Sequence, residues 1–352
     1  MLFEGKNQIP PIETFKLGSR YYFARLSPND RVWYRQIYDA WLTGSAEVTL
    51  TIPGTGHHTP DGTDWFDLVV AVLEDNPHLF HLEPSHFYCK RTGDQLHISS
   101  NSIYSQQEFW DMYALLWQRV SYLLEEAKKY NKKIDQLRFL HDYLAQTITY
   151  DYCYGDPRKE REAHTMVGAL INRHCVCDGY SRTFRLLCDR LGISCIVVLG
   201  KGPKDKDPGG HAWNIVKLDQ IPYHVDVTWD SNLSQDGVLK DYEFMQSDTS
   251  ADRRHIWQRD KYPKCPKDWP RREKLLSTEA ELEAEFVRHL KGRHKQFLLR
   301  LGGPLTDQEV FFATINQLCS KHNALLPKKG VLRYNKSEIY HYGVFRYESN
   351  NQ

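Results

Sequence analysis

Apolar side chains recur at helical spacing in several stretches of the chain, and shorter β-branched runs lie between them. The clearest helical stretch covers 109–127 and follows the capping box Ser105-x-x-Glu108. A β-branched run such as 48–52 predicts a strand instead. The expected helices are 32–41, 65–73, 105–127, 134–148, 164–173, 176–191, 279–291 and one beginning after Thr306. The expected strands are 48–52, a hairpin over 86–99, 194–199, 211–218, 223–229, 296–301, 331–335 and 339–347.

Two polar stretches divide this pattern into three parts. Residues 128–133 include four lysines, and residues 262–267 hold two prolines and two lysines, a composition typical of linkers. A chain of 352 residues is also too long for one ordinary core. We therefore predict an N-terminal α/β domain over 1–131, a middle domain over 132–262 and a small C-terminal α/β domain over 263–352.

The overall composition is that of a globular protein. Hydrophobic residues make up 41% and charged residues 26%, and 46 Lys and Arg balance 45 Asp and Glu. No charge block is large enough to predict a nucleic-acid or membrane partner. The first residues lack the apolar run of a signal peptide, so we expect a cytoplasmic protein in which the eight cysteines are mostly thiols.

Cys177 is the first candidate for chemistry. It begins a predicted helix on which Phe184, Cys188 and Leu191 share its side. The free N–H groups and positive dipole end of a helix N-terminus stabilise a thiolate, which is the reactive form of cysteine. The plain alternative is an ordinary buried cysteine.

A histidine and an aspartate lie on two strands that are predicted to pair. If the turn centres on 219–220, opposed residues have numbers that sum to about 439, and His211 faces Thr228. Asp226 then lies on the same face as a diagonal neighbour of His211. A carboxylate in an apolar strand needs such a partner. Asp230 lies past the predicted strand end, where we expect it to serve a turn.

Three separate blocks around these residues resemble bacterial transglutaminase-like proteins. They are Cys175-Val176-Cys177-Asp178-Gly179-Tyr180-Ser181, His211-Ala212-Trp213-Asn214 and Val225-Asp226-Val227-Thr228-Trp229-Asp230. The order of Cys, His and Asp is that of the family, and the resemblance covers about 135–257.

The resemblance implies an α+β fold with a papain-like core, in which a Cys-bearing helix packs on an antiparallel sheet that carries the His and the Asp. It implies that Cys177 is the nucleophile, that His211 activates it and later protonates the leaving group, and that Asp226 orients His211. The substrate is then an amide of a peptide or protein, which forms a thioester and releases an amine.

The same resemblance implies an oxyanion hole, with the Cys177 backbone N–H as one donor. Tyr150 and Tyr152 are candidates for the second donor, and Tyr180 and Trp213 are further candidates for the cleft. The sequence shows no acidic cluster of the type that binds calcium in animal transglutaminases. We therefore expect neither a metal nor another cofactor.

Three alternatives stay open from the sequence. The family includes peptidases and other amide hydrolases, transamidases that cross-link or cyclise, and silent binding modules, and protease-like hydrolysis is the reading we favour. The cysteines 175, 177, 188 and 195 could also suggest a zinc site, but they lack the paired spacing of zinc ribbons. The sequence does not predict an oligomeric state.

Overall fold

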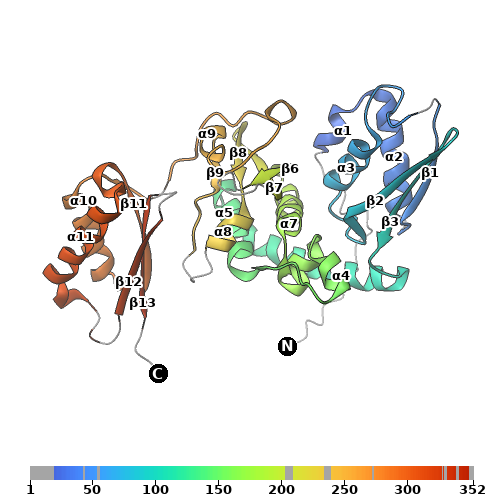
Figure 1. The fold of residues 1–352 in the computed structure, drawn as a ribbon. Helices are drawn as coiled ribbons and strands as arrows, with labels where there is room; N and C mark the ends of the chain where they lie inside the picture. The colour runs from blue at the N-terminus through green and yellow to red at the C-terminus, as the bar shows by residue number, and fades with distance from the viewer. Residues whose placement is uncertain are drawn as a thin grey trace. The chain divides into compact units, whose positions relative to one another are not determined.

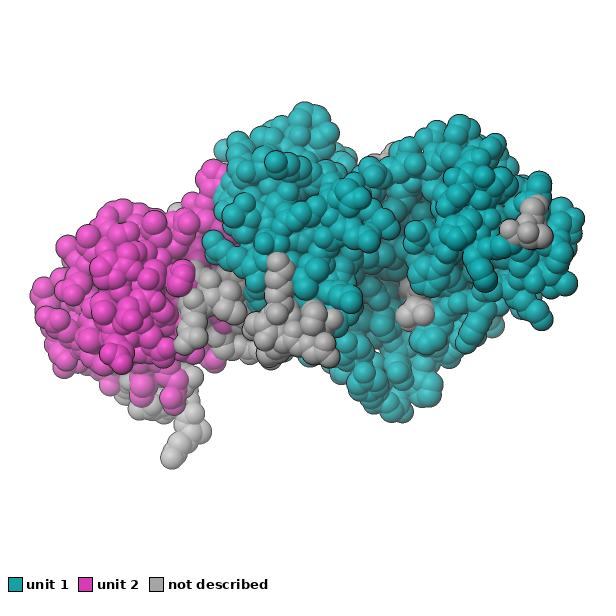
Figure 2. Space-filling model, turned by 45° about the horizontal axis from the view of Figure 1, so that its top comes forward, with its two compact units in different colours: residues 1–234, 243–269 teal, residues 235–242, 270–352 magenta. Residues whose placement is uncertain are grey.

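The chain forms two compact units. The computed structural model describes residues 20–42, 44–53, 56–202, 209–233, 239–271, 273–326, 328, 331–337 and 341–348. One unit comprises 1–234 with 243–269, and the other comprises 235–242 with 270–352 (Figure 2). The predicted N-terminal domain and most of the predicted middle domain therefore fall in one unit, whereas residues 235–242 of the predicted middle domain belong to the other. Among the described residues, no helix is both long and apolar enough to cross a membrane.

The N-terminal part of the first unit packs helices against a small antiparallel sheet. The helices are α1 (Tyr21–Arg25), α2 (Pro28–Leu42) and α3 (Trp65–Asp75), and the strands are β1 (Glu47–Thr51), β2 (Leu82–Thr92) and β3 (Gln95–Ser102). The strand order is β1-β3-β2 (Figure 1). Apolar residues at helical spacing on α2 and α3, such as Trp41 and Val72, meet Leu50 of β1 in one buried core.

The middle of the chain is an α+β core, as expected. Its helices are α4 (Gln106–Lys128), α5 (Lys133–Thr147), α6 (Pro157–Glu162), α7 (Cys177–Arg190), α8 (Val227–Leu233) and α9 (Asp248–Ala251). Its strands are β4 (Thr149–Tyr150), β5 (His174–Cys175), β6 (Ser194–Gly202), β7 (Gly209–Leu218), β8 (Ile221–Val225) and β9 (Phe244–Gln246). The last four form an antiparallel sheet in the order β6-β7-β8-β9, against which α7 packs (Figure 1).

The pairing of β7 with β8 has the predicted register. Asn214 lies opposite Val225, so that opposed residues have numbers that sum to 439. The prediction that this strand continues to 229 was wrong, because β8 ends at Val225 and α8 begins at Val227. Asp226 causes the change: its Oδ1 accepts the Trp229 N–H at 3.1 Å and so caps the new helix.

The expected helix over 164–173 is also shorter than predicted. Residues 163–165 form a turn after α6, and a π-helical turn, η2, covers Gly168–Asn172. A Cβ on Gly168 would lie 2.6 Å from the Glu162 carbonyl oxygen. Neighbouring backbone lies so close to Gly168 that no side chain fits at this position, and only glycine is accommodated.

The C-terminal unit covers one face of a four-stranded sheet with two helices (Figure 1). Its elements are β10 (Leu275–Leu276), α10 (Glu279–Lys291), β11 (Gln296–Leu301), α11 (Gln308–Lys321), β12 (Val331–Ser337) and β13 (Tyr342–Glu348). The bounds of α10 and β11 are those expected from the sequence. Asp307, rather than Thr306, caps α11 by accepting the Val310 N–H at 3.0 Å. Residues 339 and 340 of the last expected strand lie outside the described residues.

Candidate active site

Cys177 is the first residue of α7 and is half-buried. As the first helical residue, it has a backbone N–H with no partner inside the helix. The helix is tied to the sheet by Asn214, whose Nδ2 donates to the Ser181 carbonyl oxygen at 2.9 Å. Phe184 and Cys188, which share a side of α7 with Cys177, are fully buried. The start of α7 is therefore held firmly, and its first side chain remains accessible.

His211 and Asp226 form a buried hydrogen-bonded pair. Nε2 of His211 lies 2.6 Å from Oδ2 of Asp226, and the two residues are 8% and 1% exposed. Burial alone would lower the pKa of His211, but the Asp226 carboxylate and a hydrogen bond with the Cys177 side chain raise that pKa to about 10. Because Nε2 faces Asp226, Nδ1 is the ring nitrogen left for the Cys177 thiol.

A second histidine, His255, binds the same carboxylate. Its Nε2 lies 3.0 Å from Oδ2 of Asp226, and its Nδ1 lies 3.1 Å from the Ala251 carbonyl oxygen. Burial opposes ionisation of Asp226, yet the charges and hydrogen bonds of His211 and His255 outweigh it and lower the pKa of Asp226. His255 was not predicted from the sequence, because it lies outside all three blocks that resemble the family and no spacing rule connects it to Asp226.

Indole rings enclose the imidazole of His211. Trp229 stacks on it with ring centroids 4.7 Å apart and an interplanar angle of 9°. The ring centroid of Trp213 lies 5.8 Å from that of His211. Gly200 lies opposite His211 in the sheet. A Cβ on Gly200 would lie 2.6 Å from the Trp213 ring and 2.3 Å from the Ile256 carbonyl oxygen. This glycine therefore provides the space in which the indole of Trp213 lies.

Tyr150 and Tyr152 lie beside the start of α7. Tyr150 pairs with Cys175 in the short parallel sheet of β4 and β5, and its hydroxyl donates to that of Tyr152 at 3.2 Å. Burial, followed by the negative charge of a Cys177 thiolate, raises the pKa of Tyr150. Tyr150 is half-buried and Tyr152 is 40% exposed. Both tyrosines are thus near the candidate nucleophile.

The two other cleft candidates are enclosed in the core. The Tyr180 hydroxyl donates to the Ile148 carbonyl oxygen and lies 2.8 Å from Ser231 Oγ. The indole N–H of Trp213 donates to Nδ1 of His224 at 3.0 Å. Their polar groups therefore already have partners inside the protein.

Asp230 does not serve a turn, and that expectation was wrong. It lies within α8, is fully buried, and accepts from His141 Nε2 at 2.9 Å. Nδ1 of His141 donates to Asp142 at 2.8 Å. Burial works against a charged imidazole, but the two carboxylates outweigh it and raise the pKa of His141 to about 9. His141 is therefore a buried imidazolium that joins α5 to α8.

Two groups of described residues bring potential metal ligands together. In the first, His211 and His255 both approach Asp226 at hydrogen-bond distances, 2.6 and 3.0 Å. Around a zinc ion, with bonds of about 2.0–2.1 Å in a tetrahedral arrangement, these nitrogens and the oxygen would be farther apart. We therefore interpret the first group as a hydrogen-bonded cluster.

The second group is His224, Asp248 and Cys265. Nδ1 of His224 accepts from Trp213, and its Nε2 donates to Asp248 at 2.9 Å. Both imidazole nitrogens are thus occupied. Burial, together with the charge of Asp248, raises the pKa of the Cys265 thiol, which disfavours the thiolate that a metal requires. We therefore interpret the second group as a hydrogen-bonded cluster as well.

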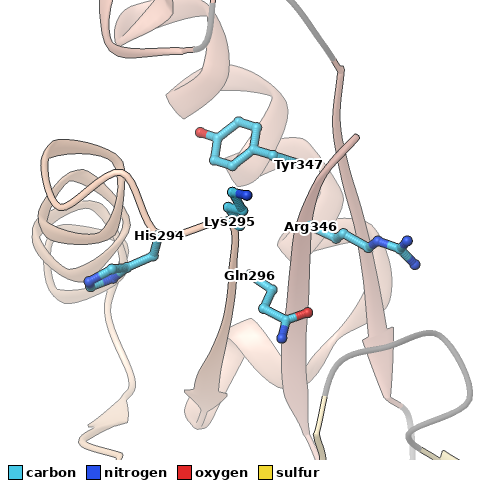
Figure 3. A pocket seen from close by; sticks show the side chains of 5 residues that line it. All are labelled: His294, Lys295, Gln296, Arg346 and Tyr347. Atoms are coloured by element: carbon cyan, nitrogen blue, oxygen red, sulfur yellow. The ribbon is translucent and has the colours of Figure 1, made fainter. Parts of the chain in front are cut away.

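A shallow hollow in the C-terminal unit carries no comparable chemistry. It is lined by His294, Lys295, Gln296, Arg346 and Tyr347. Their side chains point in different directions and do not converge on one point (Figure 3). The hollow shares no residue with the cluster around Cys177, and we assign no role to it.

A model of a known protein family matches the middle of the chain. Residues 122–229 match the model of the transglutaminase-like superfamily, which confirms the resemblance seen in the sequence. No curated protein matches the chain significantly.

Solved structures with similarity include a TGase, at 16% identity and a TM-score of 0.30, covering 55% of this chain and 52% of that chain. Another is a proposed cysteine protease from Cytophaga hutchinsonii, at 12% identity and a TM-score of 0.28. The match covers 41% of this chain and 61% of that chain. A third is a proposed protease from Parabacteroides distasonis, at 10% identity and a TM-score of 0.23. The match covers 40% of this chain and 35% of that chain. The chain thus spans about half the length of the TGase.

Proposed function

Because residues 122–229 form a transglutaminase-like core, we propose that the protein is a cysteine-dependent amide hydrolase or acyl transferase. Its substrates are amides of peptides or proteins, and Cys177, His211 and Asp226 are its catalytic triad. The observation that carries this proposal is the buried 2.6 Å pair of His211 and Asp226, with the Cys177 side chain hydrogen-bonded to the same imidazole.

In the acylation step, Cys177 attacks the carbonyl carbon of the amide as a thiolate. The thiol proton is held on Nδ1 of His211, and Asp226 fixes the ring through Nε2. When the carbon–nitrogen bond breaks, His211 transfers this proton to the departing amine. The products of this step are the free amine and a thioester on Cys177.

The developing oxyanion needs hydrogen-bond donors. The Cys177 N–H at the start of α7 is free of any partner inside the helix. The Tyr150 hydroxyl feels the charge of the same sulfur, and its proton, which is donated to the Tyr152 hydroxyl in the structure, would turn from Tyr152 to the oxyanion. We assign these two groups to the oxyanion hole. The exposed position of Tyr152 favours a role in contacting the substrate instead.

Alkylation by iodoacetamide at pH 7 tests the nucleophile. Cys177 should react faster than every other thiol, because a helix N-terminus and an adjacent imidazolium favour the thiolate. Burial and the charge of Asp64 raise the pKa of Cys89 to about 11, and burial raises the pKa values of Cys153 and Cys319. These three accessible cysteines are internal controls. Equal labelling of Cys177 and Cys89 would contradict the assignment.

Hydrolysis and transamidation share this acylation step and differ only in what breaks the thioester. Water gives a carboxylic acid, whereas an amine gives a new amide. Incubating the protein with an activated ester and increasing concentrations of an amine such as glycinamide distinguishes the two activities. A hydrolase releases mainly the acid, and a transamidase forms the amide in proportion to the amine concentration.

A further inference from the structure

The strand that carries Tyr150 has one edge without a partner. Among the described residues, the sheet of β4 and β5 consists of these two strands alone. On the side of β5, the Thr149 N–H donates to the Arg173 carbonyl oxygen at 2.9 Å. The Asp151 N–H donates to the Cys175 carbonyl oxygen at 3.1 Å. Because the backbone groups of successive residues in a strand point to opposite edges, the N–H and C=O of Tyr150 face away from β5.

The free edge extends past the end of β4. Within the described part of the chain, the backbone N–H and C=O of Tyr150 and Tyr152 have no hydrogen-bond partner on this side. At the opposite end, Ser231 Oγ of α8 donates to the Ile148 carbonyl oxygen at 3.1 Å, so the edge is already occupied there. The open stretch therefore runs from Tyr150 to Tyr152. An unpaired strand edge of this kind binds an extended peptide, whose own N–H and C=O groups complete the ladder.

The register of β4 and β5 places this edge beside the proposed nucleophile. Tyr150 lies opposite Cys175, and paired strands are about 4.8 Å apart. Cys177 follows two residues later, after Val176, whose φ of −101° and ψ of −175° are extended. Side chains two residues apart in an extended chain share a face, so Tyr150 and Cys177 lie on the same face of this small sheet. A peptide on the free edge of β4 can therefore extend its reacting carbonyl to Cys177.

Exposed tyrosine rings continue from this edge. The ring of Tyr152 meets that of Tyr150 edge to face, with centroids 5.7 Å apart. It stacks on Tyr154 with centroids 5.1 Å apart and an interplanar angle of 7°. Tyr154 is 74% exposed and Tyr152 is 40% exposed. Such rings offer a large contact area to a ligand at a low cost in conformational entropy.

Hydrogen bonds hold the turn that carries the two exposed rings. The Cys153 N–H donates to Oδ1 of Asp151 at 2.7 Å, and Cys153 has a left-handed backbone with φ 59°. The Asp156 N–H donates to the Cys153 carbonyl oxygen at 3.3 Å. Asp156 in turn caps α6, since its Oδ1 accepts the Arg158 N–H at 3.1 Å. The turn is thus fixed before a ligand arrives, which lowers the entropic cost of binding.

We propose that the edge from Tyr150 to Tyr152 binds the acyl part of the substrate as an added β-strand, and that the Tyr152–Tyr154 stack selects an aromatic side chain on that strand. The inference rests on the proposed function, since it concerns the amide that acylates Cys177. Backbone pairing tolerates many sequences, and stacking on the open tyrosine rings supplies the preference. The substrates are therefore extended peptide segments with an aromatic side chain near the reacting carbonyl.

Peptide 4-nitrophenyl esters measure this preference, because release of 4-nitrophenolate reports acylation of Cys177. The acyl parts are N-acetylated tetrapeptides of three alanines and a C-terminal glycine, with Phe replacing one alanine at each position in turn. Selectivity is the ratio of kcat/KM for the peptide ester to that for 4-nitrophenyl acetate. For the best Phe peptide, this ratio should be about 10² in the wild type. Tyr154→Ala should lower it about tenfold and affect the peptide without Phe much less.

N-methylation of the best peptide tests the strand pairing separately. A methyl group on a peptide nitrogen removes the donor and blocks close approach, and only alternate residues of an added strand face β4. Methylation at one of two successive residues should lower the selectivity ratio about tenfold. Methylation at its neighbour should leave the ratio within twofold. Equal effects at both positions would overturn the added strand.

Tyr88 provides a matched control for the tyrosine stack. It lies on β2 and is 64% exposed, so Tyr88→Ala should leave the selectivity ratio unchanged. A wild-type ratio in Tyr154→Ala, or an equal fall in Tyr88→Ala, would overturn the role of the stack. Turnover of the peptide ester that persists in Cys177→Ala would instead overturn the proposed function itself, so the two failures are distinguishable.

Discussion

Nε2 of His255 lies 3.0 Å from Oδ2 of Asp226, the same oxygen that His211 approaches at 2.6 Å. Its other nitrogen faces the Ala251 carbonyl oxygen, and the ring packs against Trp229 with centroids 4.1 Å apart. Both ring nitrogens of His255 are thus engaged within the protein. We therefore assign to it the positioning of Asp226, and through Asp226 the orientation of His211.

Replacing His255 should weaken the triad without removing any of its members. His255→Gln should lower the rate of Cys177 alkylation about tenfold, because Asp226 loses one of the contacts that fix it. His224→Gln is the matched control, since His224 is equally buried and is hydrogen-bonded to Asp248. Both variants should lower the melting temperature by several degrees. Equal alkylation rates in the two folded variants would show that His255 is only structural.

Asp226 and Asp230 should respond differently to the same substitution. Asp226→Asn should lower turnover of 4-nitrophenyl acetate by about 10³–10⁴-fold, because the neutral amide no longer selects the right imidazole tautomer. Asp230→Asn should have a much smaller effect on turnover but destabilise the fold by about 3 kcal/mol, since it leaves the buried His141 short of a carboxylate. Turnover of the folded protein and urea unfolding measure the two effects. A larger loss of turnover in Asp230→Asn would contradict the assignment.

The structural roles of Asp226 and Asp230 could be predicted from the sequence only in part. The apolar alternation of two strands and the turn between them gave the right register, and therefore the right partner for His211. The end of β8 could not be predicted, because Asp226 also caps α8, and the β-branched residues that follow it favour a strand locally.

Contacts between distant segments account for what the sequence did not predict. His255 follows Asp226 by 29 residues and meets it only through the tertiary fold. The partnership of His141 with Asp230 spans 89 residues. The residues around a histidine do not indicate which distant carboxylate it will contact. Neither the His255–Asp226 contact nor the His141–Asp230 contact could therefore be predicted from the sequence. The short π-helical turn η2 over 168–172 depends likewise on the close approach of neighbouring backbone to Gly168, which periodicity does not report.

The buried imidazolium of His141 should make stability depend on pH. Its pKa is raised from 6.5 to about 9 in the folded protein, so its stabilising contribution is complete below pH 6.5 and is lost as the pH rises through 9. The free energy of unfolding of the wild type should therefore exceed that of His141→Gln by roughly 3 kcal/mol more at pH 6.5 than at pH 9.5. Urea unfolding at the two pH values measures this. A difference that does not change with pH would refute the charged state of His141.

Tyr150 should affect acyl transfer but not the reactivity of the thiol. Tyr150→Phe removes one proposed oxyanion donor and should lower turnover of 4-nitrophenyl acetate at least tenfold. Alkylation of Cys177 by iodoacetamide forms no oxyanion, so its rate should stay within twofold of the wild type. Tyr152→Phe is the control and should change both rates little. A parallel fall in both rates for Tyr150→Phe would indicate that Tyr150 acts on the thiol instead.

In the proposed reaction, Cys177 forms a thioester with the help of His211 and Asp226. Acid quenching during turnover of 4-nitrophenyl acetate, followed by mass spectrometry of the digested protein, locates the acyl group directly. We expect an acetyl group on Cys177 in the wild type, much slower acetylation in His211→Gln and Asp226→Asn, and none at this position in Cys177→Ala. The triad would be refuted by an acetyl group that forms mainly on another cysteine. It would also be refuted by acetylation of Cys177 at the wild-type rate in His211→Gln and Asp226→Asn.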